Sequence, residues 1–382
     1  MPFSDLGLSK PLLTLIVEQA YLKPYPIQQE AIPLILVGKD VLGIARTGSG
    51  KTASYVLPIL ERLQRQRALV RSSVSHRVLV LVPTRELAVQ VAQVFQTFGA
   101  NLPRRIKTVA VFGGVSANPQ MIAVRGADVL VATPGRLLDL VAQNAVKLSG
   151  IDTLVLDEAD KILELGFADE MKQVFDLLPA QRQTVLFSAT LGDTIQDISS
   201  MVLRKPVKIE IEEETASIDQ IRQTAYRVTP ERKSALLRYL IKSGKLTQVL
   251  VFVSTTRTAD NLVAKLGKNG IQAVAMHGHK TQGARTDALA RFKSGTLPVL
   301  VATDLLARGI DIQFLPHVIN FELPRSPKDY VHRIGRTGRA DASGEAISLI
   351  TPEDEHHFGV IQKKMGKRVD MIDASVLDLT GS

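Results

Sequence analysis

Short runs of β-branched residues and leucine recur along the whole chain, and each run leads through Gly, Ser, Thr, Pro or Asp into a helical spacing of apolar residues. We predict strands at residues 78–82, 129–132, 154–156, 185–187, 249–253, 299–302 and 318–321. Nearly continuous apolar strands are buried on both faces, as in a parallel sheet flanked by helices. The pattern therefore predicts an α/β fold.

Polar residues that could carry function directly follow six of these strands. They are Pro83-Thr84-Arg85, Thr133-Pro134-Gly135-Arg136, Asp157-Glu158, Ser188-Ala189-Thr190, Ser254-Thr255 and Thr303-Asp304. Ligands of open α/β sheets bind at the carboxyl ends of the strands, so we expect these loops to form two binding edges. Ordinary turns would explain one or two of the six, but they explain all six poorly.

The chain of 382 residues is long enough for two domains. The acidic, polar stretch 209–217 interrupts the alternation of strands and helices, and the strand series restarts at Gln248. We predict domains at 1–208 and 220–382, joined by a linker at 209–219. A solvated edge strand that ends with Ile209 and Ile211 is the alternative for the start of this stretch.

Charge and cysteine content narrow the class of protein. The chain has 47 Lys and Arg against 38 Asp and Glu, a formal net charge of +9, which favours nucleic acid as a partner ahead of an anionic membrane. It has no cysteine, so disulfides, thiolate nucleophiles and Cys-based metal sites are excluded. The sequence has no apolar stretch long enough to span a bilayer, and we expect a soluble cytoplasmic protein.

Residues 45–52 read Ala-Arg-Thr-Gly-Ser-Gly-Lys-Thr, between an apolar run and a helical stretch. Glycines allow backbone N–H groups to surround phosphate oxygens at a helix N-terminus, while Lys51 supplies charge and the Thr52 hydroxyl can bind Mg²⁺. The expected nucleotide contacts of this loop are Thr47, Gly48, Ser49, Gly50, Lys51 and Thr52. Ala45 stands where the strict pattern has glycine, and a plain glycine-rich turn is the alternative.

Asp157 and Glu158 follow the strand predicted at 154–156. An acidic residue at the end of such a strand can hold magnesium, and Glu158 is placed to orient or deprotonate the attacking water. Either carboxylate alone could cap the next helix. Together with Lys51 and Thr52, the pair indicates ATP hydrolysis rather than nucleotide storage.

Asp157-Glu158-Ala159-Asp160 is also the signature that names the DEAD-box helicases, and the chain resembles the minimal two-domain core of that family, of bacterial type. Further motifs of the family occur in order: Tyr25-Pro26-Ile27-Gln28, Pro83-Thr84-Arg85-Glu86-Leu87-Ala88, Gly113-Gly114, Thr133-Pro134-Gly135-Arg136, Ser188-Ala189-Thr190, Gln282 with Arg285, Ala307-Arg308-Gly309-Ile310-Asp311 and His332-Arg333-Ile334-Gly335-Arg336-Thr337-Gly338-Arg339. The resemblance implies two tandem RecA-like domains and an ATP-dependent RNA helicase.

The resemblance also implies roles around ATP. Gln28 would read the adenine edge, with Tyr21 and Phe3 as supporting aromatics, and Asp311 would reach the ribose. Arg333 and Arg336 resemble the γ-phosphate-binding arginine and the arginine finger, so hydrolysis would require the two domains to close. A solvated helix face or a patch for the phosphate backbone is the alternative for this basic run.

Two details of the resemblance bear on affinity and coupling. Tyr25 occupies a position where the family usually has Thr or Ser, which puts a contact with the phosphate loop in doubt. Ser188 and Thr190 resemble the motif that couples hydrolysis to unwinding, and we expect them to form hydrogen bonds around Asp160 and His332 in the closed state.

Hydroxyl, glycine and arginine residues dominate the expected RNA site. The residues that match or flank the RNA motifs of the family are Pro83, Thr84, Arg85, Gly114, Thr133, Arg136, Thr255, Arg285, Thr303 and Arg308. Such residues suit phosphate and sugar contacts, and an aromatic content of 5% without tryptophan argues against an extensive stacking platform. We therefore expect sequence-independent binding of RNA. For His277 and His279, packing or phosphate contact is favoured over a metal site.

Two other functions stay open on sequence alone: a DNA translocase of the same superfamily, and an RNA clamp that uses ATP only to lock on. Gln28 in its motif and the intact acidic box favour RNA, whereas Glu158 and both arginines favour an active enzyme. A monomer with ATP and Mg²⁺ as cofactors, targeted by partner proteins, is the expectation. The sequence leaves open the RNA target, the pathway, the partners, the unwinding efficiency and the effect of Tyr25.

Overall fold

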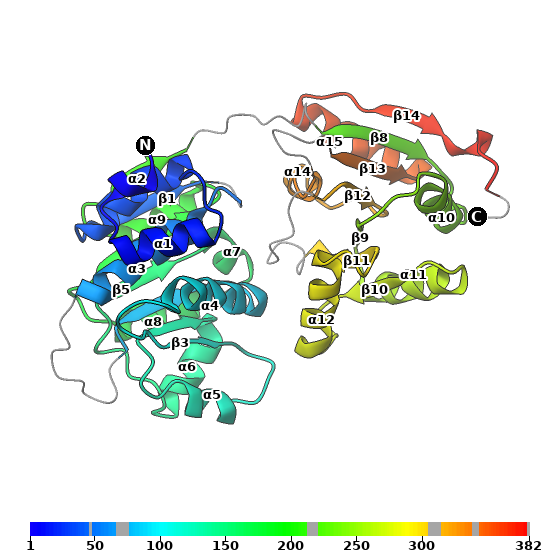
Figure 1. The fold of residues 1–382 in the computed structure, drawn as a ribbon. Helices are drawn as coiled ribbons and strands as arrows, with labels where there is room; N and C mark the ends of the chain where they lie inside the picture. The colour runs from blue at the N-terminus through cyan, green and yellow to red at the C-terminus, as the bar shows by residue number, and fades with distance from the viewer. Residues whose placement is uncertain (46–47, 66–75, 212–220, 305–314, 338–343, 380–382) are drawn as a thin grey trace. The chain divides into compact units, whose positions relative to one another are not determined.

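The computed structural model describes residues 1–45, 48–65, 76–211, 221–304, 315–337 and 344–379. It divides into two compact units, Met1–Glu213 and Glu214–Ser382, each built on one sheet with helices on its two faces (Figure 1). The units are described separately below.

The sheet of the N-terminal unit has the strand order β3-β4-β2-β5-β6-β1-β7, and all neighbouring strands are parallel. Its strands are β1 (Val41–Ile44), β2 (Val78–Leu81), β3 (Thr108–Val111), β4 (Val129–Ala132), β5 (Thr153–Leu156), β6 (Gln183–Ser188) and β7 (Val207–Glu210). β1 lies between β6 and β7, with Val41 opposite both Val185 and Val207. The loop after β1 therefore emerges beside the end of β6.

Two sets of helices cover the two faces of this sheet. The short 3-10 helix η1 (Phe3–Leu6) and helices α1 (Lys10–Glu18), α2 (Pro26–Leu36), α3 (Lys51–Arg65) and α4 (Arg85–Gly99) share one core with the valines of β2. Helices α5 (Asn118–Ala123), α6 (Pro134–Ala142), α7 (Ala159–Glu164), α8 (Ala168–Leu177) and α9 (Asp193–Val202) share the other core with the leucines of β2. Successive strand residues point to opposite faces of the sheet. The valines of β2 therefore face one core and its leucines face the other.

The sheet of the C-terminal unit has the order β10-β11-β9-β12-β13-β8-β14, again with all neighbours parallel. Its strands are β8 (Arg222–Arg227), β9 (Val249–Val253), β10 (Ala273–Met276), β11 (Val299–Thr303), β12 (His317–Asn320), β13 (Glu345–Ile350) and β14 (Asp370–Asp373). Strand for strand this is the order of the first sheet, so the two units repeat one topology.

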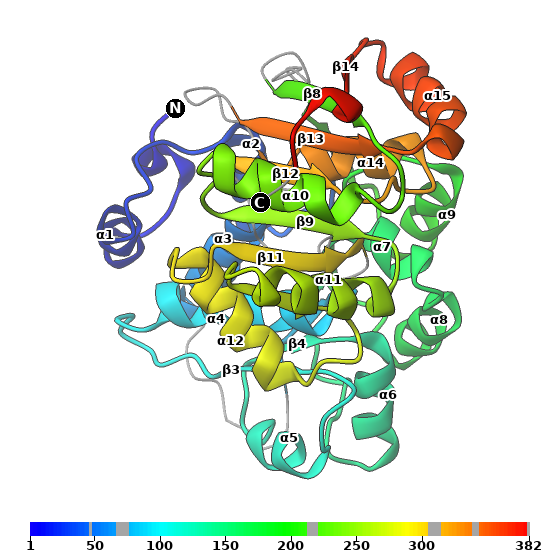
Figure 2. The ribbon, with the colours of Figure 1, turned by 90° about the vertical axis from the view of Figure 1, so that its right-hand side faces the viewer.

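The helices of this unit are α10 (Lys233–Ser243), α11 (Thr256–Lys268), α12 (Gln282–Lys293), α14 (Pro327–Ile334) and α15 (Glu355–Met365), with 3-10 turns η2 (Pro352–Asp354) and η3 (Ala374–Val376). Figure 2 shows α10 and α11 against the same face of the sheet, where both contribute to one core. α12, α14 and α15 contribute to the cores of the other face.

The strands predicted from the apolar runs are all present, with ends that differ from the prediction by at most two residues. The α/β, parallel-sheet prediction is confirmed. Ile209 and Glu210, which the pattern assigns to the start of the linker, lie in the edge strand β7, as in the alternative prediction, although β7 ends before Ile211. The rest of the predicted linker from residue 212 lies outside the described residues, so the domain boundaries stay a prediction. In the described part of the chain, no helix is long and apolar enough to cross a membrane.

Candidate functional site

The glycine-rich loop joins β1 to α3, and Lys51 is the first residue of that helix. Gly48 and Gly50 have φ angles of 88° and 87°, a left-handed conformation that glycine adopts without steric cost. Lys51 is 6% exposed, and its ammonium donates a hydrogen bond to the Ala45 carbonyl over 2.8 Å. This bond joins the first residue of α3 to the residue that follows β1. Thr47 lies outside the described residues.

Gln28 connects α2 to this loop. Its side chain is fully buried, its Nε2 donates to the Gly50 carbonyl over 3.1 Å, and its Oε1 accepts from the Tyr25 backbone N–H over 2.9 Å. A Cβ at Gly50 would lie 2.5 Å from Gln28 Nε2 and 2.8 Å from Tyr25 Cδ2, so only glycine fits there. Tyr25, which departs from the family pattern, thus packs its ring against the phosphate loop and stays 47% exposed.

The two supporting aromatics lie together. The rings of Tyr21 and Phe3 meet edge-on with centroids 6.4 Å apart, and Tyr21 also meets Phe98 edge-on at 5.4 Å. Tyr21 is half-buried, whereas Phe3 and Phe98 belong to the core. Tyr21 is therefore a half-buried surface residue whose ring packs on two buried aromatic rings.

Asp157 follows the last residue of β5 and is almost completely buried. Its Oδ2 accepts a 2.8 Å hydrogen bond from the hydroxyl of Tyr55 on α3. Its Oδ1 has no hydrogen-bond partner among the residues that the structure describes. Burial raises the pKa of Asp157 above its ordinary value, although the charge of Lys51 opposes that shift.

Tyr55 was not among the residues that the sequence predicted. Burial and the charge of Asp157 raise the pKa of its phenol well above the ordinary value, so the hydroxyl remains a donor. The one sequence signal was its position four residues after Lys51, which places both side chains on one face of a helix.

Glu158 has φ 54° and ψ 48°, a left-handed conformation that is uncommon for a residue with a Cβ. Such strain persists only where the surroundings impose it, and it is frequent at functional sites. Glu158 is buried, and its Oε2 lies 2.9 Å from Nζ of Lys161, one turn later in α7. The turn after β5 therefore presents two adjacent buried carboxylates, one facing Tyr55 and the other Lys161.

Ser188 and Thr190 connect the end of β6 to the acidic turn. The Ser188 hydroxyl donates to the Thr190 carbonyl over 2.8 Å and accepts from the Thr190 N–H over 3.3 Å. The Thr190 hydroxyl then donates to Asp160 Oδ2 over 3.3 Å. Three of the four residues expected to couple hydrolysis to unwinding thus form one chain of hydrogen bonds. The fourth, His332, is half-buried in the other unit.

The RNA-motif residues of the N-terminal unit follow β2, β3 and β4. Thr84 and Thr133 are the N-cap residues of α4 and α6. Gly114, with φ 74°, lies directly against the guanidinium of Arg85, where a side chain would collide with it. Arg136 is buried; its Nη2 donates to the Val115 carbonyl over 2.9 Å, and Nη1 has no hydrogen-bond partner in the described ranges. Pro83 is buried at the end of β2.

The strand order of the sheet separates the RNA-motif residues from the residues predicted to bind and hydrolyse ATP. β3, β4 and β2 carry the RNA-motif residues, and β5, β6 and β1 carry the phosphate loop, the acidic turn and Ser188. Because the carboxyl ends of parallel strands share one edge of the sheet, both groups lie along that edge, side by side.

In the C-terminal unit, Arg333 of α14 is 2% exposed and held from several sides. Its Nε and Nη2 form a two-pronged ion pair with Asp304 at 2.5 and 2.7 Å. Its Nη1 donates to Asn320 Oδ1 over 3.1 Å and to the Glu322 carbonyl over 2.6 Å, and the Phe252 ring lies 4.9 Å from the guanidinium carbon. In this structure, residues of the C-terminal unit itself thus accept the hydrogen bonds of the Arg333 side chain.

The remaining predicted residues of this unit follow β9, β10, β11 and α14. Thr255 is the N-cap of α11 and accepts from the Thr258 N–H over 3.0 Å, while Arg285 is buried on α12 and donates to Gln282. Thr303 ends β11, and Arg336 is buried just after α14. Arg308 and Asp311 lie outside the described residues.

His277 forms a 3.1 Å contact with Asp260, which also binds Lys280 at 2.8 Å.

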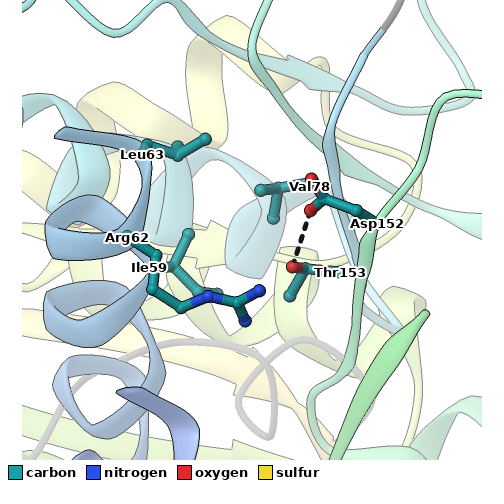
Figure 3. Close-up of a pocket in the computed structure, with 6 residues that line it drawn as sticks. All are labelled: Ile59, Arg62, Leu63, Val78, Asp152 and Thr153. Carbon is teal, nitrogen blue, oxygen red and sulfur yellow. Dashed lines mark hydrogen bonds between the residues drawn. The ribbon is translucent and has the colours of Figure 1, made fainter. Parts of the chain in front are cut away.

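A small pocket of the N-terminal unit lies away from these residues (Figure 3). Its lining comes from the second half of α3 and from the starts of β2 and β5: Ile59, Arg62, Leu63, Val78, Asp152 and Thr153. At 1.5 Å per residue, Ile59 lies about 12 Å along α3 from Lys51. The pocket is therefore at the amino ends of the strands, opposite the predicted nucleotide site.

Comparison with known proteins identifies the family. Residues 25–198 match the DEAD/DEAH box helicase model, and residues 231–341 match the helicase conserved C-terminal domain. The chain is 37% identical over 98% of its length to the DEAD-box ATP-dependent RNA helicase CshA of Bacillus cereus, and 40% identical over 97% to that of Streptococcus pneumoniae. It spans 70% and 69% of these relatives.

The chain belongs to the DEAD-box ATP-dependent RNA helicases. Among solved structures, Saccharomyces cerevisiae Dbp5 bound to RNA and ADP BeF3 is similar, with a TM-score of 0.83 and 32% identity, covering 97% of this chain and 95% of Dbp5. The predicted fold of two RecA-like units and the predicted class, an ATP-using RNA helicase of the DEAD-box family, are confirmed. The roles of individual residues in this helicase remain predictions.

Proposed function

We propose that this helicase hydrolyses ATP when RNA brings its two units together, and that it thereby separates or remodels short stretches of RNA. The observation that carries the proposal is the carboxyl edge of the N-terminal sheet. There the phosphate loop, a buried acidic turn and the RNA-motif residues lie along one row of strand ends. Nucleotide and RNA bound at this edge would act on the same loops.

The nucleotide would bind over the loop between β1 and α3. Backbone N–H groups at the start of α3 suit phosphate oxygens, and Lys51 would leave the Ala45 carbonyl to reach the β- and γ-phosphates. Tyr21 offers an aromatic edge for the base. Gln28 would read adenine only by giving up its bond to Gly50 or by using a remaining lone pair or N–H. Thr47 and Asp311 keep their expected nucleotide roles as part of the proposal.

The Asp157 carboxylate fits a magnesium ion, and the Thr52 hydroxyl keeps its expected role as a second ligand. Magnesium prefers oxygen ligands and is commonly bound by one or two carboxylates together with substrate phosphates. The Oδ1 of Asp157 is a buried carboxylate oxygen without a hydrogen-bond partner in the described residues, and such an oxygen can bind a cation. When bound, magnesium would neutralise charge that develops on the phosphates.

Glu158 would orient the attacking water and accept its proton. Its left-handed backbone turns the carboxylate away from the direction that a regular helix start would give it. Lys161, 2.9 Å away, holds that carboxylate in place in this structure. This ion pair and the burial of Glu158 restrict the rotation of its side chain.

Arg336 is our candidate for the finger that stabilises the transferring phosphoryl group, a role worth roughly 10³–10⁵ in rate. Arg333 is proposed to bind the γ-phosphate, but only if its contacts with Asp304 and Asn320 rearrange. Without that rearrangement, Arg333 would instead fix the turn that carries Arg336. His332 is proposed to join Asp160, Ser188 and Thr190 in coupling the two units.

RNA would lie across the N-terminal ends of helices. Thr84, Thr133 and Thr255 each begin a helix of nine residues or more, where N–H groups and the helix dipole favour phosphate. Pro83, Arg85, Gly114, Arg136, Arg285, Thr303 and Arg308 would complete this sequence-independent surface. We further propose a cytoplasmic monomer that partner proteins direct to its RNA.

Steady-state phosphate release from ATP and Mg²⁺, with no nucleic acid, single-stranded RNA or DNA of the same sequence, tests this function. We expect strong stimulation by RNA alone. Glu158→Gln should lower the RNA-stimulated rate by about 10²–10⁴ because the proton acceptor is lost, while ATP binding persists. Equal stimulation by DNA would favour a translocase, and undetectable hydrolysis would favour an RNA clamp.

A further inference from the structure

The phenol of Tyr55 lies inside the proposed catalytic centre and has no assigned role there. It is fully buried on α3, one helical turn beyond Lys51, and its hydroxyl donates a 2.8 Å hydrogen bond to Asp157 Oδ2. The two residues are 102 positions apart in the sequence, so this bond joins the helix of the phosphate loop to the acidic turn after β5.

The Tyr55 ring has little freedom to move. Its centroid lies 5.8 Å from that of Phe187 on β6 and 6.4 Å from that of Phe95 on α4. Both neighbours are almost completely buried, and side chains in close-packed interiors sit in rotamer minima with few voids around them. The position of the hydroxyl is therefore set by the core and not by Asp157.

The two oxygens of the Asp157 carboxylate are in different situations as a result. Oδ2 is bound by Tyr55, whereas Oδ1 is buried without a hydrogen-bond partner in the parts of the chain that the structure describes. The two oxygens of a carboxylate are equivalent, so a half-turn about the Cβ–Cγ bond changes nothing, whereas a smaller rotation would break the bond to the phenol. The fixed phenol therefore holds the plane of the carboxylate, with one oxygen bound and the other left available.

We infer that Tyr55 is a positioning residue: its hydroxyl holds Asp157 so that one carboxylate oxygen is kept for the magnesium ion of the ATP complex. Groups that hydrogen-bond a metal-binding carboxylate orient it, and their loss commonly weakens metal binding about 10- to 100-fold. The inference rests on the magnesium role proposed for Asp157. It assigns to the tyrosine a role beyond that of a core aromatic.

Tyr55→Phe removes only the hydroxyl and keeps the ring in its aromatic packing. The test is calorimetric binding of ADP in the presence of MgCl₂ and in the presence of a chelator. In wild-type protein, magnesium should strengthen ADP binding. In Tyr55→Phe, we expect this strengthening to fall about 10-fold, with magnesium-free ADP affinity unchanged within about twofold. The MgCl₂ concentration for half-maximal ATPase should rise by a similar factor.

Tyr330→Phe is the matched control, because Tyr330 is the other large, fully buried tyrosine and its hydroxyl lies 3.1 Å from Ser348 in the C-terminal unit. It should leave the magnesium effect on ADP binding unchanged. Three results would overturn the inference: an unchanged magnesium effect in Tyr55→Phe, an equal loss in Tyr330→Phe, or a loss of magnesium-free ADP binding in Tyr55→Phe, which would indicate a structural role alone.

Asp157→Asn separates this inference from the function on which it rests. If Asp157 contributes to magnesium binding, Asp157→Asn should lose most of the magnesium effect on ADP affinity. Wild-type behaviour of Asp157→Asn would refute the magnesium role of Asp157 and the inference with it. A loss in Asp157→Asn without a loss in Tyr55→Phe would refute the inference alone.

Discussion

The buried guanidinium of Arg333 is held by specific partners rather than by solvent. Asp304, Asn320 and the Glu322 carbonyl accept its hydrogen bonds, and the Phe252 ring covers it. The motif indicates a γ-phosphate role for Arg333, which stays a prediction, and the partners of Arg333 in this structure come from three other segments of the chain. Their approach depends on the folded sheet, so the sequence pattern could not reveal them.

Asp304→Ala should destabilise the C-terminal unit, because it leaves the Arg333 charge buried without its ion pair. The expected loss in the free energy of unfolding is about 2 kcal/mol, below the roughly 3–5 kcal/mol of a fully buried pair because Asp304 is 30% exposed. Denaturant unfolding measures it. Asp304→Asn, which keeps a hydrogen-bond acceptor, should lose less. Equal stability of Asp304→Ala and wild type would show that the pair contributes nothing.

Residues whose function depends on local geometry were only partly predictable. The types and positions of Lys51, Asp157 and Glu158 were evident from the glycine loop and the strand before the acidic pair. The left-handed backbone of Glu158 and the hydrogen bond from Tyr55 were not. The sequence pattern indicates only that a tyrosine within an apolar helix belongs to the core. The folded structure is needed to show that its hydroxyl contacts Asp157.

At the scale of elements, three strand ends form a connected unit. β1 carries the phosphate loop, β5 carries Asp157 to Asp160, and β6 carries Ser188 and Thr190. The Ala45 N–H donates to the Ser188 carbonyl over 3.0 Å, and Thr190 bonds Asp160, so the three loops are cross-linked through β6. A change at β6 can therefore reach both loops without removing any group proposed for chemistry.

The double substitution Ser188→Ala and Thr190→Ala should uncouple hydrolysis from unwinding. The Thr190 hydroxyl bonds Asp160, the Ser188 hydroxyl holds the Thr190 backbone, and neither hydroxyl is proposed to contact ATP. We expect RNA-stimulated ATPase to stay within about threefold of wild type, while unwinding of a short RNA duplex falls at least about 10-fold. Measuring both activities on one preparation checks this. If both fell in parallel, the division of labour would be wrong.

Strand positions were predicted well where apolar runs are continuous, as at 129–132 and 249–253, because central parallel strands are buried on both faces. The edge strand β14 has four exposed residues, and β7 has only one buried residue of four. Such strands lack the apolar signal. The sequence pattern therefore assigns Ile209 and Glu210, which complete β7, to the linker.

At the scale of the whole molecule, one topology occurs twice but only one copy carries a phosphate loop. The connection from β1 to α3 contains Gly48 and Gly50, whereas the corresponding connection from β8 to α10, residues 228–232, contains no glycine. The second unit thus lacks this means of surrounding phosphates with backbone N–H groups. Its expected contribution to ATP hydrolysis is Arg336.

Approach of the two units is the central claim, and fluorescence energy transfer between them measures it most directly. The chain has no cysteine, so exposed Gln196 on α9 and Lys265 on α11 can each be replaced by cysteine and labelled. We predict that transfer efficiency changes only when single-stranded RNA and a non-hydrolysable ATP analogue are both present. An unchanged efficiency under that condition, or the same change with DNA or with the nucleotide alone, would contradict RNA-dependent closure.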